Sequence, residues 1–149
     1  MALSAFAMDT SFYSSLGSYE CDAKCQMTKE LGYDGIYFTL WTEPAWADVS
    51  RFGEVQQRHA IQVAGVYAAL GSPADDEAVE RVHTLLETLE GCKNVELAIL
   101  APADTDVQNS DSRGDDDVLR VLERLLEPAE RRGITISLYP HLYCWLERT

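Results

Sequence analysis

The sequence has little positive charge. Its 149 residues include 12 Lys and Arg against 25 Asp and Glu, which gives a formal net charge of −13. No basic run occurs, whereas a surface that binds nucleic acid needs positive charge to meet the phosphate groups. The acidic balance likewise disfavours an anionic membrane surface. We therefore expect neither nucleic acid nor a membrane as a partner.

Long apolar runs and paired metal-ligand motifs are also missing. Nothing approaches the roughly 20 apolar residues of a membrane span, and MALSAFAMDT has no basic segment or apolar run typical of a signal peptide. Of four cysteines, only Cys21 and Cys25 share a helical face, without a second Cys or His pair at zinc spacing. We expect buried, reduced cysteines in a soluble, cytoplasmic chain, although a leader removed before residue 1 leaves no trace.

A glycine-rich phosphate loop is absent after the first apolar run, where AMDTSFYSSLG stands in place of a GxGxxG pattern. This argues against a dinucleotide-binding fold. What is present is normal for a globular domain, with 46% hydrophobic and 25% charged residues.

Apolar runs alternate regularly with one-sided apolar stripes. Short runs rich in β-branched and aromatic residues predict strands, and apolar residues at i, i+4, i+7 and i+8 predict helices. Pro128 predicts a kink or an early end of the last helix. The predicted strands are Phe6 to Asp9, Gly35 to Leu40, Gln62 to Leu70, Val95 to Leu100 and Ile134 to Leu138. The first two predicted helices are Glu20 to Leu31 and Val49 to His59. The third begins at Asp75 and has the apolar stripe Ala78, Val82, Leu85, Leu86 and Leu89, and the fourth begins at Asp115 and has the apolar stripe Val118, Leu122, Leu125, Leu126 and Ala129.

This order is typical of the α/β class, with parallel βα repeats in a sheet covered by helices. A doubly wound sheet and a (β/α)8 barrel both accommodate five strands. The missing phosphate loop favours the barrel, which needs about 250 residues. We therefore expect a partial (β/α)8 TIM barrel of about five strands and four helices. Residues 1–149 are expected to form one domain that is truncated after the fifth strand.

Three stretches resemble a known family: FAMDTSF at 6–12, LGYDGIYF at 31–38 and GITISLYPHLYCWLER at 133–148. Together they resemble the xylose isomerase-like TIM barrels, which include sugar phosphate isomerases and epimerases and the endonuclease IV group. The resemblance runs along the whole chain and covers the first five βα units of the family's eight. The acidic charge disfavours the nuclease branch.

The resemblance implies a ketose/aldose isomerase or epimerase. In such enzymes a divalent ion (Mn, Mg or Zn) polarises the sugar, and a carboxylate or His moves a proton between carbons. Family members commonly carry Glu-Pro-His at the end of strand five, with the Glu as a metal ligand. This sequence has Tyr139, Pro140 and His141 there. We therefore expect no metal site within this chain, and the divalent ion is implied by the resemblance only.

Polar and aromatic residues follow the fifth predicted strand, where parallel α/β sheets meet their ligands. His141 is the candidate proton carrier, or else a residue that orders its loop. Tyr139 is a candidate for hydrogen bonding to a sugar hydroxyl, or for plugging the barrel mouth. Trp145 is a candidate for stacking on a sugar ring, with core packing as its alternative. Glu147 reads as a solvated carboxylate.

Earlier strand ends carry further candidates. Glu43 lies between Trp41 and Trp46 in a predicted loop, WTEPAWA, and aromatic neighbours would desolvate its carboxyl and raise its pKa. Glu43 is then a catalytic candidate and Trp41 a substrate contact, while a lid loop without catalysis is the alternative. Asp9 ends the first strand and either binds substrate or caps the following turn.

The leading interpretation is a sugar or sugar phosphate isomerase or epimerase in its full-length form, with the isolated chain inactive. The alternative is a non-catalytic carbohydrate-binding or scaffold module that has lost its metal site. The expected partner is a small sugar or sugar derivative. We also expect self-association through the open edges of an incomplete barrel.

Overall fold

The computed structural model describes residues 3–14, 17–71, 74–100 and 110–147. Two compact units emerge from the packing of the chain: Met1–Tyr67 with Leu89–Asn94, and Ala68–Thr88 with Val95–Thr149. The prediction of a single domain is not tested by this division.

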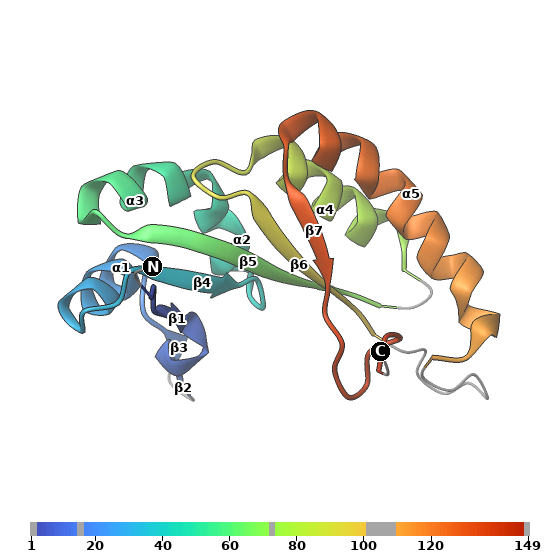
Figure 1. Ribbon diagram of the computed structural model, residues 1–149, viewed down its shortest axis with the longest axis horizontal. Coiled ribbons are helices and arrows are strands. Elements are labelled where there is room, and N and C mark those ends of the chain that lie inside the picture. Colours follow the sequence, from blue (N-terminus) through green and yellow to red (C-terminus); the bar gives the residue numbers. More distant parts are fainter. Residues whose placement is uncertain (1–2, 15–16, 72–73, 101–109, 148–149) are drawn as a thin grey trace. The chain divides into compact units, whose positions relative to one another are not determined.

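The main sheet has five parallel strands in the order β1-β4-β5-β6-β7 (Figure 1). Its strands follow the predicted apolar runs closely, so the expected α/β class with parallel βα repeats is confirmed. The strands are β1 (Phe6–Met8), β4 (Gly35–Thr39), β5 (Gln62–Leu70), β6 (Asn94–Ile99) and β7 (Thr135–Leu138).

In the first unit, β1 pairs with β4 and β4 pairs with β5, both in parallel. Two glycines permit close approaches between these strands. A Cβ at Gly35 would lie 2.6 Å from the Gln62 carbonyl oxygen, and one at Gly65 would lie 2.3 Å from the Tyr37 ring. The helices of this unit are α1 (Cys21–Glu30), α2 (Glu43–Asp48) and α3 (Phe52–His59), with the 3-10 turns η1 (Asp9–Phe12) and η2 (Val49–Arg51).

Two elements of the first unit were not expected from the sequence. A small antiparallel hairpin follows β1, formed by β2 (Tyr13–Ser14) and β3 (Gly17–Ser18). The predicted WTEPAWA loop is wrong, because most of it is helix α2. Thr42 caps this helix by accepting a hydrogen bond from the Ala45 N–H, and Pro44 is tolerated because the first turn needs no N–H donor.

In the second unit, α4 (Asp76–Thr88) and α5 (Asp115–Arg132) lie side by side (Figure 1). Ion pairs from Arg124 to Asp76 and from Arg131 to Glu87 connect the two helices. A short 3-10 turn, η3 (Ser112–Gly114), precedes α5.

The predicted early end at Pro128 is wrong, because α5 continues to Arg132 and ends at Gly133 in the left-handed conformation. The alternative, a kink at Pro128, stays a prediction. Pro128 is buried with Leu125 and Ala129, so the apolar face favours a continuous helix despite the missing N–H. The predicted stripe is corrected at two positions: Leu126 is 55% exposed and Leu122 is only half-buried, whereas Val121 is buried.

Candidate functional site

The buried carboxylate of Asp9 organises the carboxyl ends of β1 and β4. Its side chain is 0% exposed. One oxygen accepts hydrogen bonds from the Thr39 backbone N–H at 2.9 Å and the Thr39 hydroxyl at 2.7 Å. The other oxygen pairs with the Lys24 ammonium at 2.9 Å. The expected alternative, in which Asp9 caps the turn after β1, is therefore wrong.

Lys24 is the counter-charge, and sequence reasoning missed it. It lies on the buried face of α1 with Cys21, Cys25 and Thr28, at helical spacings of three and four residues. A lysine on an otherwise small, buried face is a signal that the sequence contained. Its ammonium also lies 4.3 Å from the centre of the Tyr13 ring, a cation–π arrangement.

The four cysteines are buried and free of disulfides, as expected. Burial raises the pKa of the Cys92 thiol, which keeps it protonated and unreactive at neutral pH.

A cavity of about 710 Å³ opens beside this ion pair, within the first unit. This volume suits a small molecule, since ligand pockets typically span about 300–1,000 Å³. Its walls are formed by the β2–β3 hairpin, the start of α1, helix α2, and Arg51 at the end of η2. The residues that line it are Tyr13, Ser14, Gly17, Ser18, Tyr19, Glu20, Lys24, Thr42, Pro44, Ala45, Ala47, Asp48 and Arg51.

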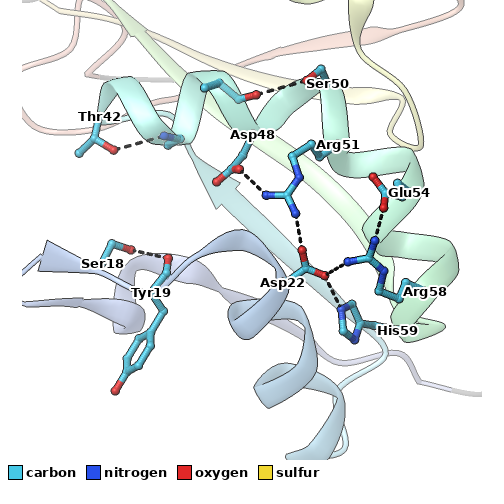
Figure 2. A network of polar contacts seen from close by, with 12 residues as sticks. Ser18, Tyr19, Asp22, Thr42, Asp48, Ser50, Arg51, Glu54, Arg58 and His59 are labelled. Atoms are coloured by element: carbon cyan, nitrogen blue, oxygen red, sulfur yellow. Dashed lines mark hydrogen bonds and ion pairs between the residues drawn. The ribbon is translucent and has the colours of Figure 1, made fainter.

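A polar network joins α1 to the segment from α2 to α3 (Figure 2). Two of its members, Asp48 and Arg51, also line the cavity. Asp22 accepts hydrogen bonds from Arg51 and Arg58, and lies 2.9 Å from the His59 ring nitrogen Nε2. Asp48 pairs with Arg51 at 3.1 Å. The hydrogen bond from His59, reinforced by Arg58 and Arg51, holds the pKa of Asp22 below its usual range.

The predicted Trp41–Glu43 cluster is more open than expected. Glu43 is exposed on the first turn of α2, so the expected desolvation of its carboxyl is not found. Trp41 is 55% exposed, and its ring centre lies 5.4 Å from that of Tyr13. The predicted roles of Glu43 and Trp41 in binding or catalysis stay predictions.

In the second unit, the end of β7 brings Tyr139 and His141 together as expected. Their rings stack with centres 5.3 Å apart and an interplanar angle of 11°. His141 is exposed, and its Nδ1 lies 3.0 Å from the Leu142 carbonyl oxygen. The pair thus presents an imidazole to solvent, supported underneath by a phenol.

Trp145 is half-buried. Its backbone N–H donates a hydrogen bond to the backbone carbonyl of Ile99, at the end of β6, at 2.6 Å. Its indole Nε1 is buried without a hydrogen-bond partner among the described residues. The Trp145 carbonyl accepts hydrogen bonds from Ser110, and Glu147 follows on the same short segment. Ring stacking on a sugar and core packing both stay predictions for Trp145.

Glu96 on β6 is a further ionisable residue that sequence reasoning did not select. Burial raises the pKa of its carboxyl. Glu96 was overlooked because it lies inside the apolar run VELAIL, which predicts only a buried strand.

The candidates therefore divide between the units. Asp9, Trp41 and Glu43 belong to the first, and Tyr139, His141 and Trp145 to the second.

Among the described residues, no group of three or more His, Cys, Asp or Glu side chains is arranged to hold a metal ion. In the same part of the chain, no helix combines the length and apolar character needed to cross a membrane.

No protein-family model and no curated protein sequence matches this chain. Solved structures do match it. Protein SMc04130 from Sinorhizobium meliloti 1021 aligns over 91% of this chain with a TM-score of 0.68 at 13% identity. The probable 3-DHS dehydratase AsbF, involved in petrobactin synthesis, from Bacillus anthracis aligns over 97% with a TM-score of 0.67 at 12% identity.

A third match is mannonate dehydratase from Streptococcus suis serotype2, which aligns over 94% of this chain with a TM-score of 0.62 at 10% identity. These structural neighbours are xylose isomerase-like TIM barrel enzymes, and the matches show that this chain shares their parallel βα fold. The fold resemblance expected from the three sequence stretches is thus confirmed. This chain spans about half the length of these structures, covering 50%, 54% and 54% of them.

Proposed function

We propose that this chain contributes to a xylose isomerase-like barrel enzyme that modifies small sugars or sugar derivatives, as an isomerase or epimerase acting by proton transfer. The observation that carries the proposal is the chemistry at the carboxyl ends of parallel strands, where barrel enzymes place their active sites. Asp9 and Thr39 occupy such ends in the first unit, and Tyr139 and His141 follow one in the second. Two structural matches, a mannonate dehydratase and a probable 3-DHS dehydratase, support a sugar-modifying enzyme of this fold.

His141 is the proposed proton carrier. When its Nδ1–H donates to the Leu142 carbonyl, 3.0 Å away, Nε2 keeps a lone pair that can remove a proton from the carbon beside a sugar carbonyl. The Tyr139 ring beneath it restricts the orientation of the imidazole. The exposed carboxylate of Glu43, on the first turn of α2 in the first unit, is a second candidate general base.

A resident metal ion does not fit the side chains that the structure describes in residues 3–14, 17–71, 74–100 and 110–147. Divalent Mn, Mg and Zn need several carboxylate or imidazole ligands, and the described residues contain no such group of three. At the end of β7, Tyr139 offers a neutral phenol where a carboxylate ligand would be expected. The roles proposed above therefore use side chains only.

A non-catalytic carbohydrate-binding or scaffold module is the second candidate. The Tyr139 phenol at the end of β7 favours it, because a stacked Tyr–His pair can hold a sugar without any proton transfer. The cavity in the first unit is available to either function.

The two functions are separated by solvent isotope exchange. A panel of free aldoses and ketoses and their phosphate esters is incubated with the chain in D₂O, and deuterium on the carbon beside the carbonyl is followed by proton NMR. Proton transfer predicts enzyme-dependent exchange, and the His141→Gln variant should slow it by about 10²-fold or more. Tyr33→Ala, an exposed tyrosine in the first unit, serves as the control.

Binding of a sugar without any exchange would contradict the isomerase proposal and leave the binding module. Absence of both binding and exchange over the panel would contradict both functions.

A further inference from the structure

The cavity of the first unit has a buried donor at its floor. Lys24 lines the cavity although its side chain is only 5% exposed. An ammonium group carries three N–H donors. Among the described residues, Asp9 is its one hydrogen-bond acceptor, at 2.9 Å, and the Tyr13 ring covers another side. A donor of this kind, buried and still short of acceptors, suits a ligand oxygen in the cavity.

The charges around the cavity are balanced or negative. Lys24 is neutralised by Asp9, and Arg51 by Asp48 and Asp22. Glu20, which is exposed at the start of α1, adds a further negative charge and has no ion-pair partner among the described residues. A phosphate or carboxylate ligand would therefore meet no unpaired cation, and it would face like charge. Hydroxyl groups, which both donate and accept, match the carboxylates and the ammonium together.

Aromatic surface completes the site. Tyr13 and Tyr19 both line the cavity, and Tyr19 is 59% exposed. Tyrosine supplies rigid apolar area with a polar tip, which suits the C–H face of a sugar ring.

We propose that this cavity binds an uncharged polyhydroxylated compound, with the Lys24 ammonium as the hydrogen-bond donor at its floor. The proposal deepens the proposed function, on which it rests, by assigning the substrate class as an unphosphorylated sugar. Lys24 binds a ligand oxygen and Asp9 is a positioning residue, because it acts through Lys24.

Calorimetric titration with matched probes tests this assignment. The probes are free hexoses and pentoses, the phosphate esters of the same sugars, and glucosamine as a cationic analogue. Free sugars should bind, and each phosphate ester should bind roughly tenfold more weakly or worse. Glu20→Gln removes one exposed negative charge, so it should reduce the difference in affinity between each free sugar and its phosphate ester. Tyr19→Ala should lower the affinity for free sugars about tenfold, whereas Tyr33→Ala should not change it.

Removing Lys24 alone leaves a buried carboxylate unpaired, so the informative variant is the pair Asp9→Asn with Lys24→Met. It should keep the circular dichroism spectrum and lose sugar binding. If this double variant does not fold, Tyr19→Ala and Glu20→Gln still test sugar binding in the cavity, because both side chains are exposed and their replacement should not unfold the chain.

Equal or tighter binding of the phosphate esters or of glucosamine, or sugar binding unaffected by Tyr19→Ala, would overturn the assignment. So would the absence of binding by every probe. Isotope exchange with sugar binding unaffected by the cavity variants would overturn this assignment alone. Cavity binding without exchange would support it and contradict the isomerase proposal.

Discussion

At the level of single residues, Asp9 and Lys24 form a buried ion pair in the first unit. Both side chains are almost fully buried, and the carboxylate also accepts two hydrogen bonds from Thr39. Breaking such a pair by removing one partner leaves an uncompensated buried charge, which costs about 3–5 kcal/mol.

Asp9→Asn is therefore expected to lower the free energy of unfolding by about that amount, measured by urea denaturation. The double variant with Lys24→Met should recover most of the loss, because neither charge remains buried. A double variant no more stable than Asp9→Asn would show that the pair is not the cause.

Asp22 makes the stability of the first unit depend on pH. The folded state lowers the pKa of this carboxyl below its ordinary value of 3.8. A lowered carboxyl pKa contributes stability that is fully present above the unfolded pKa and is lost as the pH falls through the folded pKa. The contribution is modest because the side chains of Arg51 and Arg58 are partly exposed.

Asp22→Asn should therefore be less stable than the natural sequence at pH 7, and the difference should shrink below pH 3.8. Thermal unfolding across this pH range measures it, with the exposed Glu123→Gln as the control. A difference that stays constant from pH 7 to pH 3 would contradict the role given to this carboxyl.

Among the elements, the junction of β1, β4 and β5 is the most tightly constrained. A Cβ at Gly35 would meet the Gln62 carbonyl oxygen at 2.6 Å and the Phe6 ring at 2.7 Å, whereas nothing lies within 4 Å of one at Gly71. Backbone atoms cannot move aside as a flexible side chain can.

Gly35→Ala is thus expected to destabilise the chain by about 1–3 kcal/mol, and Gly71→Ala to leave it nearly unchanged. Chemical denaturation of the two variants in parallel gives the comparison. Equal stability of both would mean that these strands do not approach as closely as described.

The elements predicted well from the sequence are those with a strong local pattern. GIYFTL and VELAIL are apolar runs long enough to specify buried strands, and the Gly133 stop after Arg131 and Arg132 marks the end of α5 correctly. The β2–β3 hairpin was not predictable because its two-residue strands carry almost no periodic signal. Helix α2 was missed because Pro44 reads as a loop residue until Thr42 is known to cap a first turn.

The same distinction applies to the candidate site. Tyr139 and His141 are two residues apart in the sequence, so their proximity could be foreseen. The partners of Asp9 lie 15 and 30 residues away, and only the pairing of β1 with β4 and the placement of α1 bring them together.

For the whole chain, β1 and β7 stand at the two ends of the strand order, and we propose that these edges promote self-association. Phe6 and Met8 on β1 are 44% and 46% exposed, and Leu119 and Leu126 on α5 are each 55% exposed. Apolar edges of this kind tend to pair with other chains.

Light scattering should therefore show a mass above that of the monomer at high concentration. Replacing Phe6 and Met8 with lysine should shift the chain towards the monomer, since charged edge residues disfavour pairing. A concentration-independent monomer for the natural sequence would contradict self-association.

The central claim is that ligands meet this chain at the carboxyl ends of its parallel strands. Amide chemical-shift mapping with an unphosphorylated sugar tests it most directly. The account predicts that the largest shifts follow β1, β4 and β7, at Asp9, Trp41 and His141 and in the residues around the cavity. Shifts confined to the residues that precede these strands, around Ala5, Asp34 and Ile134, would contradict it.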